Sequence, residues 1–160
     1  MSDAVTLTRR EGVFHLEMTR PEKKNALTAE MYRLMADALA EAEADAATRV
    51  ILISGAGGQF TAGNDLTDFM ASPPLDDSAP VFRFIDGFSR LTKPFVAAIE
   101  GVAVGVGTTM LLHCDLAYAG AGARFALPFA NLGLVPEAAS SLLLPLLAGH
   151  ARAAELLMLG

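Results

Sequence analysis

The sequence predicts a single α/β domain. Short apolar runs of strand type alternate along the chain with amphipathic segments of helix type, and this alternation is typical of the α/β class. The length of 160 residues is that of one ordinary domain. Apolar residues make up 52% of the chain and charged residues 19%, so the chain can bury a core and lacks the composition of a disordered protein.

The first predicted elements are two strands and a helix. Residues 5–10 and 13–18 are joined by a turn at residues 11–12, and apolar side chains alternate along the second segment. Thr28 has the side chain of a helix N-cap, and apolar residues then recur at helical spacing to about Ala47.

The rest of the chain continues the alternation. Continuous apolar runs predict buried strands, and glycine and proline mark the breaks between elements. We expect a helix to begin at Pro136 and Pro145 to kink or end it. The other expected elements are a strand over 50–53, a glycine-rich loop over 55–65, a helical turn over 65–70, a mobile loop over 71–80, a helix through 82–88, a strand over 94–99, a helix over 105–113, a strand over 115–118 and a helix over 152–159.

Charge and hydropathy exclude two classes of function. The net charge of −6 argues against a nucleic-acid-binding protein, which needs a basic face. No apolar stretch reaches the roughly 18 to 20 residues that a membrane span needs. The N-terminus lacks the apolar core of a signal peptide, so we expect the protein to stay in the cytoplasm.

The cysteine and histidine content predicts no metal site. Cys114 is the only cysteine, and its apolar surroundings favour a buried, inert thiol. His15, His113 and His150 have no metal-ligand spacing with an acidic partner, and we assign them no role.

A cluster of basic residues precedes the first helix. Arg20, Lys23 and Lys24 fall close together, and Arg9 and Arg10 lie upstream. On charge alone, the cluster is either a solvated loop or a binding site for a phosphorylated ligand.

Two glycine-rich loops, each between an apolar strand and a helix, are the candidate binding loops. Neither has the Gly-Lys-Ser/Thr ending of a P-loop, and Gly105 and Gly107 are followed by Met110 where a dinucleotide fingerprint needs a third glycine. Two strand-to-helix turns in one small domain can aim two backbone amides at a developing oxyanion. Taken alone, however, the glycines favour the simpler interpretation of two tight turns.

Four segments carry a resemblance to a known family. In chain order they are RPEKKNALT, GQFTAGNDL, KPFVAAIEGVAVGVGTTMLLHCDLAYA and FALPFANLGLVPEAASS. From about residue 5 to residue 160, the chain resembles the crotonase (enoyl-CoA hydratase/isomerase) superfamily. The resemblance implies a crotonase (ClpP-like) fold, which is a spiral of β-β-α units, an acyl-CoA thioester as substrate, no separate cofactor, and trimer-based oligomers.

The length of the chain bears on this resemblance. Members of the family usually continue with helices that roof the acyl pocket and build the trimer. We therefore expect residues 1–160 to form a crotonase-fold core domain without the C-terminal helical region. A homotrimer or hexamer is expected if that region is not essential for assembly.

The resemblance also implies an oxyanion hole and a binding path. In the family, one amide donor follows the Ala-Gly of the first loop, which is Asn64 here, and the other is the middle residue of a glycine triplet, which is Val106 here. Only a backbone N–H is used, so valine is acceptable there, although its bulk narrows the acyl pocket. The residues implied in substrate and CoA binding are Lys24, Ala26, Leu27, Ala62, Asn64, Asp65, Leu66, Val106, Phe129 and Leu134.

The catalytic positions favour one reaction of the family. Hydratases carry two glutamates where this chain has Thr109 and Phe129, and adding water needs both a base and an acid. The segment LGLVPEAASS instead resembles the Δ3,Δ2-enoyl-CoA isomerases of the peroxisomal and bacterial type, in which the glutamate at the position of Glu137 is the catalytic base. Without the resemblance, Pro136-Glu137 favours the ordinary start of a helix.

The predicted function is therefore an enoyl-CoA isomerase that shifts the double bond of 3-enoyl-CoA to 2-trans-enoyl-CoA. Glu137 is the predicted base, and the amides of Asn64 and Val106 hold the thioester oxygen of a dienolate. Two alternatives remain open at this point: a hydratase or other divergent crotonase acting on a different acyl-CoA, and a non-catalytic fragment that binds acyl-CoA.

Overall fold

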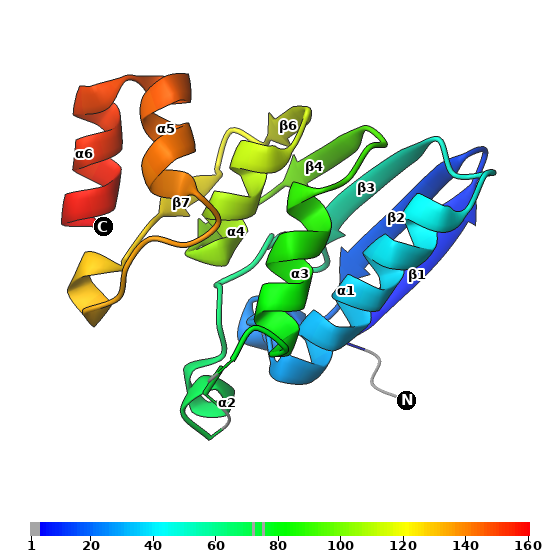
Figure 1. The fold of residues 1–160 in the computed structure, drawn as a ribbon, viewed down its shortest axis with the longest axis horizontal. Helices are drawn as coiled ribbons and strands as arrows, with labels where there is room; N and C mark the ends of the chain where they lie inside the picture. The colour runs from blue at the N-terminus through cyan, green and yellow to red at the C-terminus, as the bar shows by residue number, and fades with distance from the viewer. Residues whose placement is uncertain (1–3, 72, 75) are drawn as a thin grey trace.

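A five-stranded sheet with helices on one face forms the main body of the molecule (Figure 1). The computed structural model describes residues 4–71, 73–74 and 76–160. The strand order is β1-β2-β3-β4-β6; β1 and β2 are antiparallel, and the other neighbours are parallel. The strands are β1 (Val5–Arg10), β2 (Val13–Met18), β3 (Val50–Gly55), β4 (Phe95–Ile99) and β6 (Leu116–Ala119).

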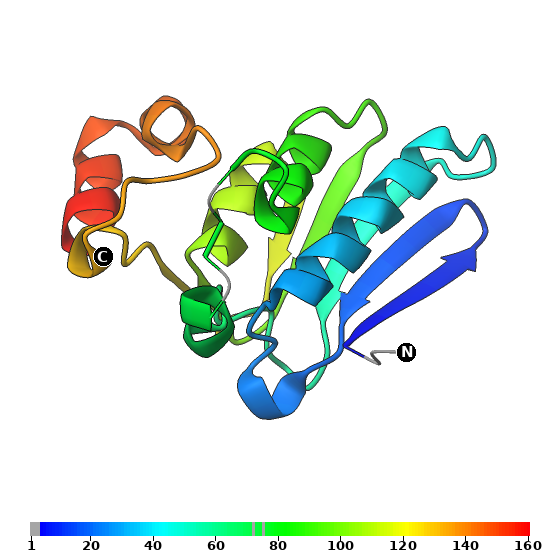
Figure 2. The same ribbon diagram turned by 60° about the horizontal axis from the view of Figure 1, so that its bottom comes forward.

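Helices α1 (Ala29–Ala44) and α3 (Pro80–Ser89) pack against each other over this sheet, as Figures 1 and 2 show. Thr28 caps α1 as predicted, because its hydroxyl accepts the N–H of Met31 at 3.3 Å. The main core lies between the sheet and these helices. Its largest fully buried side chains include Phe14, Leu16, Met35, Leu39, Ile51, Phe60, Phe84 and Phe95.

Two short strands form a second sheet that the sequence did not predict. Strands β5 (Val102–Val104) and β7 (Arg124–Ala126) pair in parallel. Each has only three residues, which is too short for an alternating pattern to be recognised. Three stretches of the chain have the order β-β-α, so the predicted spiral of such units is present. They are β1-β2-α1, β4-β5 with helix α4 (Val106–Thr109), and β6-β7 with helix α5 (Ser140–Ala148).

The short elements position the candidate loops. Helix α2 (Leu66–Ala71) confirms the predicted helical turn, whereas the predicted helix over 105–113 divides into α4 (Val106–Thr109) and a 3-10 turn, η2 (Met110–His113). Two further 3-10 turns are η1 (Pro21–Lys23) and η3 (Ala130–Leu132). The predicted mobile loop over 71–80 includes Ser72 and Leu75, which lie outside the described residues.

Helices α5 (Ser140–Ala148) and α6 (His150–Leu159) pack on each other at the left of Figure 1. The prediction that a helix begins at Pro136 was wrong, because Ala139 lies in the left-handed region with φ +53° and α5 begins only at the next residue. Pro145 lies inside α5 and does not end it. None of the helices described here is long and apolar enough to cross a membrane.

Candidate active site

Asn25 fastens the basic segment to the first glycine-rich loop. Its side-chain amide donates to the carbonyl oxygens of Ala56 and Gln59 at 3.0 and 2.6 Å, and its side-chain oxygen accepts the N–H of Arg20 at 2.8 Å. Its own carbonyl accepts the Thr61 hydroxyl at 2.7 Å. Asn25 is fully buried with φ +54°, so these four bonds hold a backbone conformation that non-glycine residues rarely adopt.

The first loop leaves the amide of Asn64 free to bind a ligand. Leu27 pairs with this loop as an isolated parallel bridge, in which its N–H donates to Gly63 and its carbonyl accepts from Asp65, both at 2.8 Å. In such a bridge the residue between the two partners directs its own amide to the other side. No described residue accepts a hydrogen bond from the Asn64 N–H.

The second loop lies directly against the first. A Cβ on Gly63 would stand 2.7 Å from the carbonyl oxygen of Val104, and a Cβ on Gly107 would stand 2.5 Å from Cγ2 of Thr61. The missing side chains therefore allow the two loops to touch. Gly105, with φ +56°, turns the chain into α4, so the N–H of Val106 is the first of that helix and has no partner within it.

A cavity of about 420 Å³ opens between these loops and the segment before α5. It brings together many of the predicted site residues and adds several others. Its lining consists of Ala62, Gly63, Asn64, Leu66, Phe69, Val104, Gly105, Val106, Pro128, Phe129, Leu132, Leu134 and Glu137. Glu137 is the only carboxylate among the described residues of this lining. A second cavity, of about 380 Å³, shares Asn64, Phe69, Phe129, Leu134 and Glu137 with it.

Glu137 does not begin a helix, so the alternative interpretation of this residue was wrong. Its carbonyl accepts two bonds from the buried Ser140, from the N–H at 2.9 Å and from the hydroxyl at 2.6 Å. Ala138 and Ala139 between them both have positive φ, +51° and +53°. This tight turn presents the Glu137 side chain to the cavity.

The surroundings of Glu137 make it a base suited to neutral pH. Burial raises the pKa of its carboxyl to about 7, and a weak hydrogen bond at 3.5 Å from the Thr109 hydroxyl opposes that rise. Phe129, only 7% exposed, lines the same cavity and helps to exclude water. A carboxylate with a pKa near the working pH is effective in proton transfer to and from carbon.

The positions at which hydratases carry glutamates are also near this site. Thr109 is fully buried and donates to Glu137, and Phe129 lines the cavity. Neither side chain can exchange a proton near neutral pH. Among the described residues, no group of three His, Cys, Asp or Glu side chains is placed to hold a metal ion.

Comparison with known proteins now identifies the family. The sequence model for enoyl-CoA hydratase/isomerase matches residues 8–160. The chain belongs to the enoyl-CoA hydratase/isomerase family.

Two relatives and one solved structure show how far the likeness extends. The chain is 39% identical to 1,2-epoxyphenylacetyl-CoA isomerase of Escherichia coli (strain K12), over 94% of this chain and 60% of that protein. It is also 39% identical to enoyl-CoA delta isomerase 2 of Rattus norvegicus, over 99% of this chain and 42% of that protein. The structure of OdaA from Pseudomonas aeruginosa superposes with a TM-score of 0.95 at 53% identity, covering 99% of this chain and 64% of that one.

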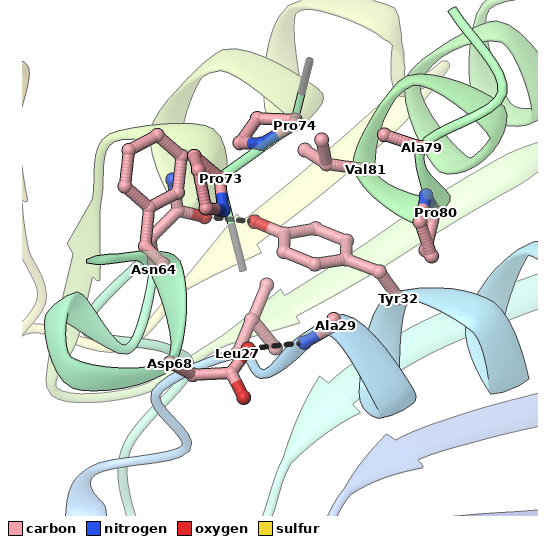
Figure 3. A pocket seen from close by; sticks show the side chains of 11 residues that line it. Leu27, Ala29, Tyr32, Asn64, Asp68, Pro73, Pro74, Ala79, Pro80 and Val81 are labelled. Carbon is pink, nitrogen blue, oxygen red and sulfur yellow. Dashed lines mark hydrogen bonds between the residues drawn. The ribbon is translucent and has the colours of Figure 1, made fainter. Parts of the chain in front are cut away.

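In this member of the family, several predicted binding residues lie away from the cavity. Asp65 forms an ion pair with Arg20 at 2.7 Å and accepts hydrogen bonds from two N–H groups at the start of α2. The bond from Arg20 is the largest cause of the lowered pKa of the Asp65 carboxyl, and the two backbone bonds add to it. Lys24 is exposed with φ +49°. The carbonyl oxygen of Ala26 accepts a hydrogen bond from the Arg20 guanidinium at 3.0 Å. Leu27 is buried against a smaller cavity that Figure 3 shows.

Two residues near the site were missed by the sequence interpretation. The Tyr32 hydroxyl donates to the side-chain oxygen of Asn64, the bond drawn in Figure 3. His113, to which we assigned no role, bonds through Nε2 to the carbonyl of Ala138 at 2.8 Å. Both residues lie in apolar helical segments, where periodicity predicts burial and says nothing of a distant polar partner.

Proposed function

We propose that this chain carries an acyl-CoA isomerisation site, in which Glu137 moves a proton while the amides of Asn64 and Val106 bind the thioester oxygen. The observation that carries the proposal is a single desolvated carboxylate in the same cavity as two adjoining glycine-rich turns. This arrangement supports proton transfer next to a carbonyl, and a 3-enoyl-CoA is the substrate that such a site converts with one base.

The reaction needs no group beyond these. Ionised Glu137 takes the C2 proton of the 3-enoyl thioester, and the electron pair of the C–H bond spreads over the alkene and the carbonyl to form a dienolate. The two amides donate to the oxygen as its negative charge grows, and losing one such donor typically costs about 3 to 4 kcal/mol of transition-state stabilisation. Glu137 then returns the proton at C4, which leaves the double bond between C2 and C3.

We propose that CoA binds at the part of the same cavity that the exposed Leu66 lines. Ala62 and Leu66 line the cavity, and we propose that they flank the pantetheine arm. We propose that the exposed Lys24 binds a phosphate of CoA, beside a backbone that Asn25 fixes by its hydrogen bonds. CoA is then part of the substrate, with no separate cofactor. The homotrimer or hexamer and the cytoplasmic location remain predictions.

The alternatives make different demands on the cavity. A hydratase needs a second proton-transferring group, whereas the two family positions hold Thr109 and Phe129. A different acyl group is a closer alternative. The name of the Escherichia coli relative specifies an epoxyphenylacetyl group, and Phe69 and Phe129 offer aromatic surface in this cavity. A phenyl-bearing 3-enoyl-CoA therefore belongs in the assay beside an aliphatic one.

The test is turnover of trans-3-hexenoyl-CoA, followed by the absorbance of the conjugated product. Glu137→Gln is compared with Glu155→Gln, a matched change at an exposed residue of α6. We expect isomerisation by the wild type and by Glu155→Gln, and a loss of at least about a hundredfold in Glu137→Gln. Equal turnover in all three proteins refutes the assigned base. Binding without turnover in the wild type favours a non-catalytic acyl-CoA-binding protein, and hydration of 2-enoyl-CoA favours a hydratase.

A further inference from the structure

Four aromatic rings form a continuous row through the core. The Tyr32 ring of α1 lies 5.8 Å from Phe84, Phe84 lies 5.2 Å from Phe88 on the same helix α3, and Phe88 lies 5.1 Å from the His113 ring of η2, measured between ring centroids. The contacts are tilted or edge-to-face, which are the favoured geometries for aromatic pairs. Because Phe84 and Phe88 are buried on one face of α3, the row has a fixed centre.

One end of this row holds the oxyanion side of the site. The hydroxyl of Tyr32, a residue only 4% exposed, donates to Oδ1 of Asn64, as Figure 3 shows. Asn64 carries the unpaired amide described above, so the bond limits the rotation of the residue that supplies it. Burial raises the pKa of the Tyr32 phenol well above its usual value, and nearby Glu137 adds to the rise, so the hydroxyl keeps its proton.

The other end of the row holds the base. A carbonyl oxygen can only accept, so His113 Nε2 must carry a proton and donate it to Ala138 at 2.8 Å. Ala138 and Ala139 are non-glycine residues at positive φ, and such positions persist only where surrounding contacts hold them. The bond from His113 and the two bonds from Ser140 are among those contacts, and they restrain the backbone on the C-terminal side of Glu137.

We infer that Tyr32 and His113 are positioning residues for the two halves of the proposed site, held in register by the edge-to-face pair Phe84 and Phe88. The inference rests on the proposed function for its catalytic consequence. Neither residue lines the cavity of about 420 Å³, so each acts through the residue that it holds. The charge of the Glu137 carboxylate contributes to the raised pKa of the Tyr32 phenol, and Thr109 donates a hydrogen bond to that carboxylate.

The oxyanion end is tested with Tyr32→Phe, which removes the hydroxyl and keeps the ring against Phe84. Tyr118→Phe is the matched control, because Tyr118 is 65% exposed on β6 and is the other tyrosine of the chain. We expect kcat to fall about tenfold with KM nearly unchanged, the size of effect that one lost hydrogen bond of ordinary strength allows. The absorbance shift of bound 2,4-hexadienoyl-CoA, which reports polarisation of the thioester carbonyl, falls in the same variant.

The base end is tested with His113→Leu and with His113→Gln, which retains an N–H donor. His150→Leu, at an exposed position of α6, is the control. When the turn relaxes, water reaches the carboxylate, so we expect the pKa of Glu137 to fall by at least about half a unit in His113→Leu and to be largely restored in His113→Gln. The carbon-13 signal of the Glu137 carboxyl, assigned by its loss in Glu137→Gln, measures this pKa in the free protein.

These measurements test the positioning roles separately from the proposed function. A change in the hexadienoyl-CoA shift and in the carboxyl titration supports the positioning roles even if the wild type fails to isomerise 3-enoyl-CoA, which would refute the proposed function alone. Folded Tyr32→Phe and His113→Leu proteins with unchanged spectra and titration overturn the positioning roles, whatever the turnover. An equal fall in the pKa of Glu137 in His113→Leu and in His113→Gln also overturns the role of the His113 hydrogen bond.

Discussion

Replacing Glu137 with glutamine should stabilise the protein in a pH-dependent way. Glutamine has nearly the same shape as a protonated glutamate and never ionises. Burial raises the pKa of Glu137 from 4.5 to about 7 in the folded protein, so the native state binds more protons than the unfolded state between these values. The stability of the wild type therefore falls as pH rises through this window, while that of Glu137→Gln lacks this loss.

The raised pKa of Glu137 sets the size of the gain in the free energy of unfolding. The difference between 7 and 4.5 is 2.5 pKa units. At about 1.36 kcal/mol per unit this corresponds to about 3 kcal/mol, and partial solvent access to the side chain makes about 2 to 3 kcal/mol the expected range. The gain of Glu137→Gln over the wild type should be small at pH 5 and nearly complete at pH 8.5.

Urea unfolding at several pH values between these limits measures the free energy of unfolding of both proteins. Glu155→Gln, at an exposed ion pair, serves as the control and should show no such trend. A difference between Glu137→Gln and the wild type that is independent of pH would refute the burial of an ionisable carboxylate at this position. A difference that shrinks as pH rises would refute it equally.

Three further changes test the local structure. Thr109→Val removes a hydrogen bond that lowers the pKa of Glu137, so this pKa should rise and the acidic limb of the pH–rate profile should move to higher pH. An unmoved limb would show that the bond has no effect on the pKa of Glu137. Gly63→Ala places a Cβ 2.7 Å from a backbone oxygen at φ +81°, so the free energy of unfolding measured in urea should fall by about 1 to 3 kcal/mol. Gly122→Ala places its Cβ in open space and should lower this free energy far less. Equal losses would contradict the close approach of the loops. Burial raises the pKa of Cys114 to about 12, so iodoacetamide at pH 8 should alkylate the folded protein far more slowly than the urea-unfolded chain. Equal alkylation rates would show that the folded protein has an accessible thiolate.

The main sheet and its helices were predictable because each has a repeating pattern long enough to recognise. The strand over 13–18 alternates apolar side chains, and the helix after Thr28 carries a continuous apolar stripe with a capping residue. Local rules failed where the backbone follows distant contacts. Pro136 has the sequence context of a helix start, yet the positive φ of Ala138 and Ala139 delays the helix to Ser140.

The site was predictable only in part for a related reason. Family motifs indicated Asn64, Val106 and Glu137, and the structure places all three in one cavity. The side chains that hold them come from far along the chain. Tyr32 is separated by 32 residues from Asn64, and His113 by 25 residues from its partner before α5. Hydrophobic periodicity predicts that such residues are buried and carries no information about a single long-range hydrogen bond.

The most direct test of the account is exchange of the C2 protons of a saturated acyl-CoA, such as butyryl-CoA, in D2O. Loss of the C2 proton signals in the NMR spectrum reports abstraction next to the thioester carbonyl, without any later step. We predict exchange with the wild type and with Glu155→Gln, and exchange near the uncatalysed rate with Glu137→Gln. Equal exchange by the wild type and by Glu137→Gln, or none by the wild type when it is saturated with butyryl-CoA, would contradict the claim that Glu137 forms an enolate in this cavity.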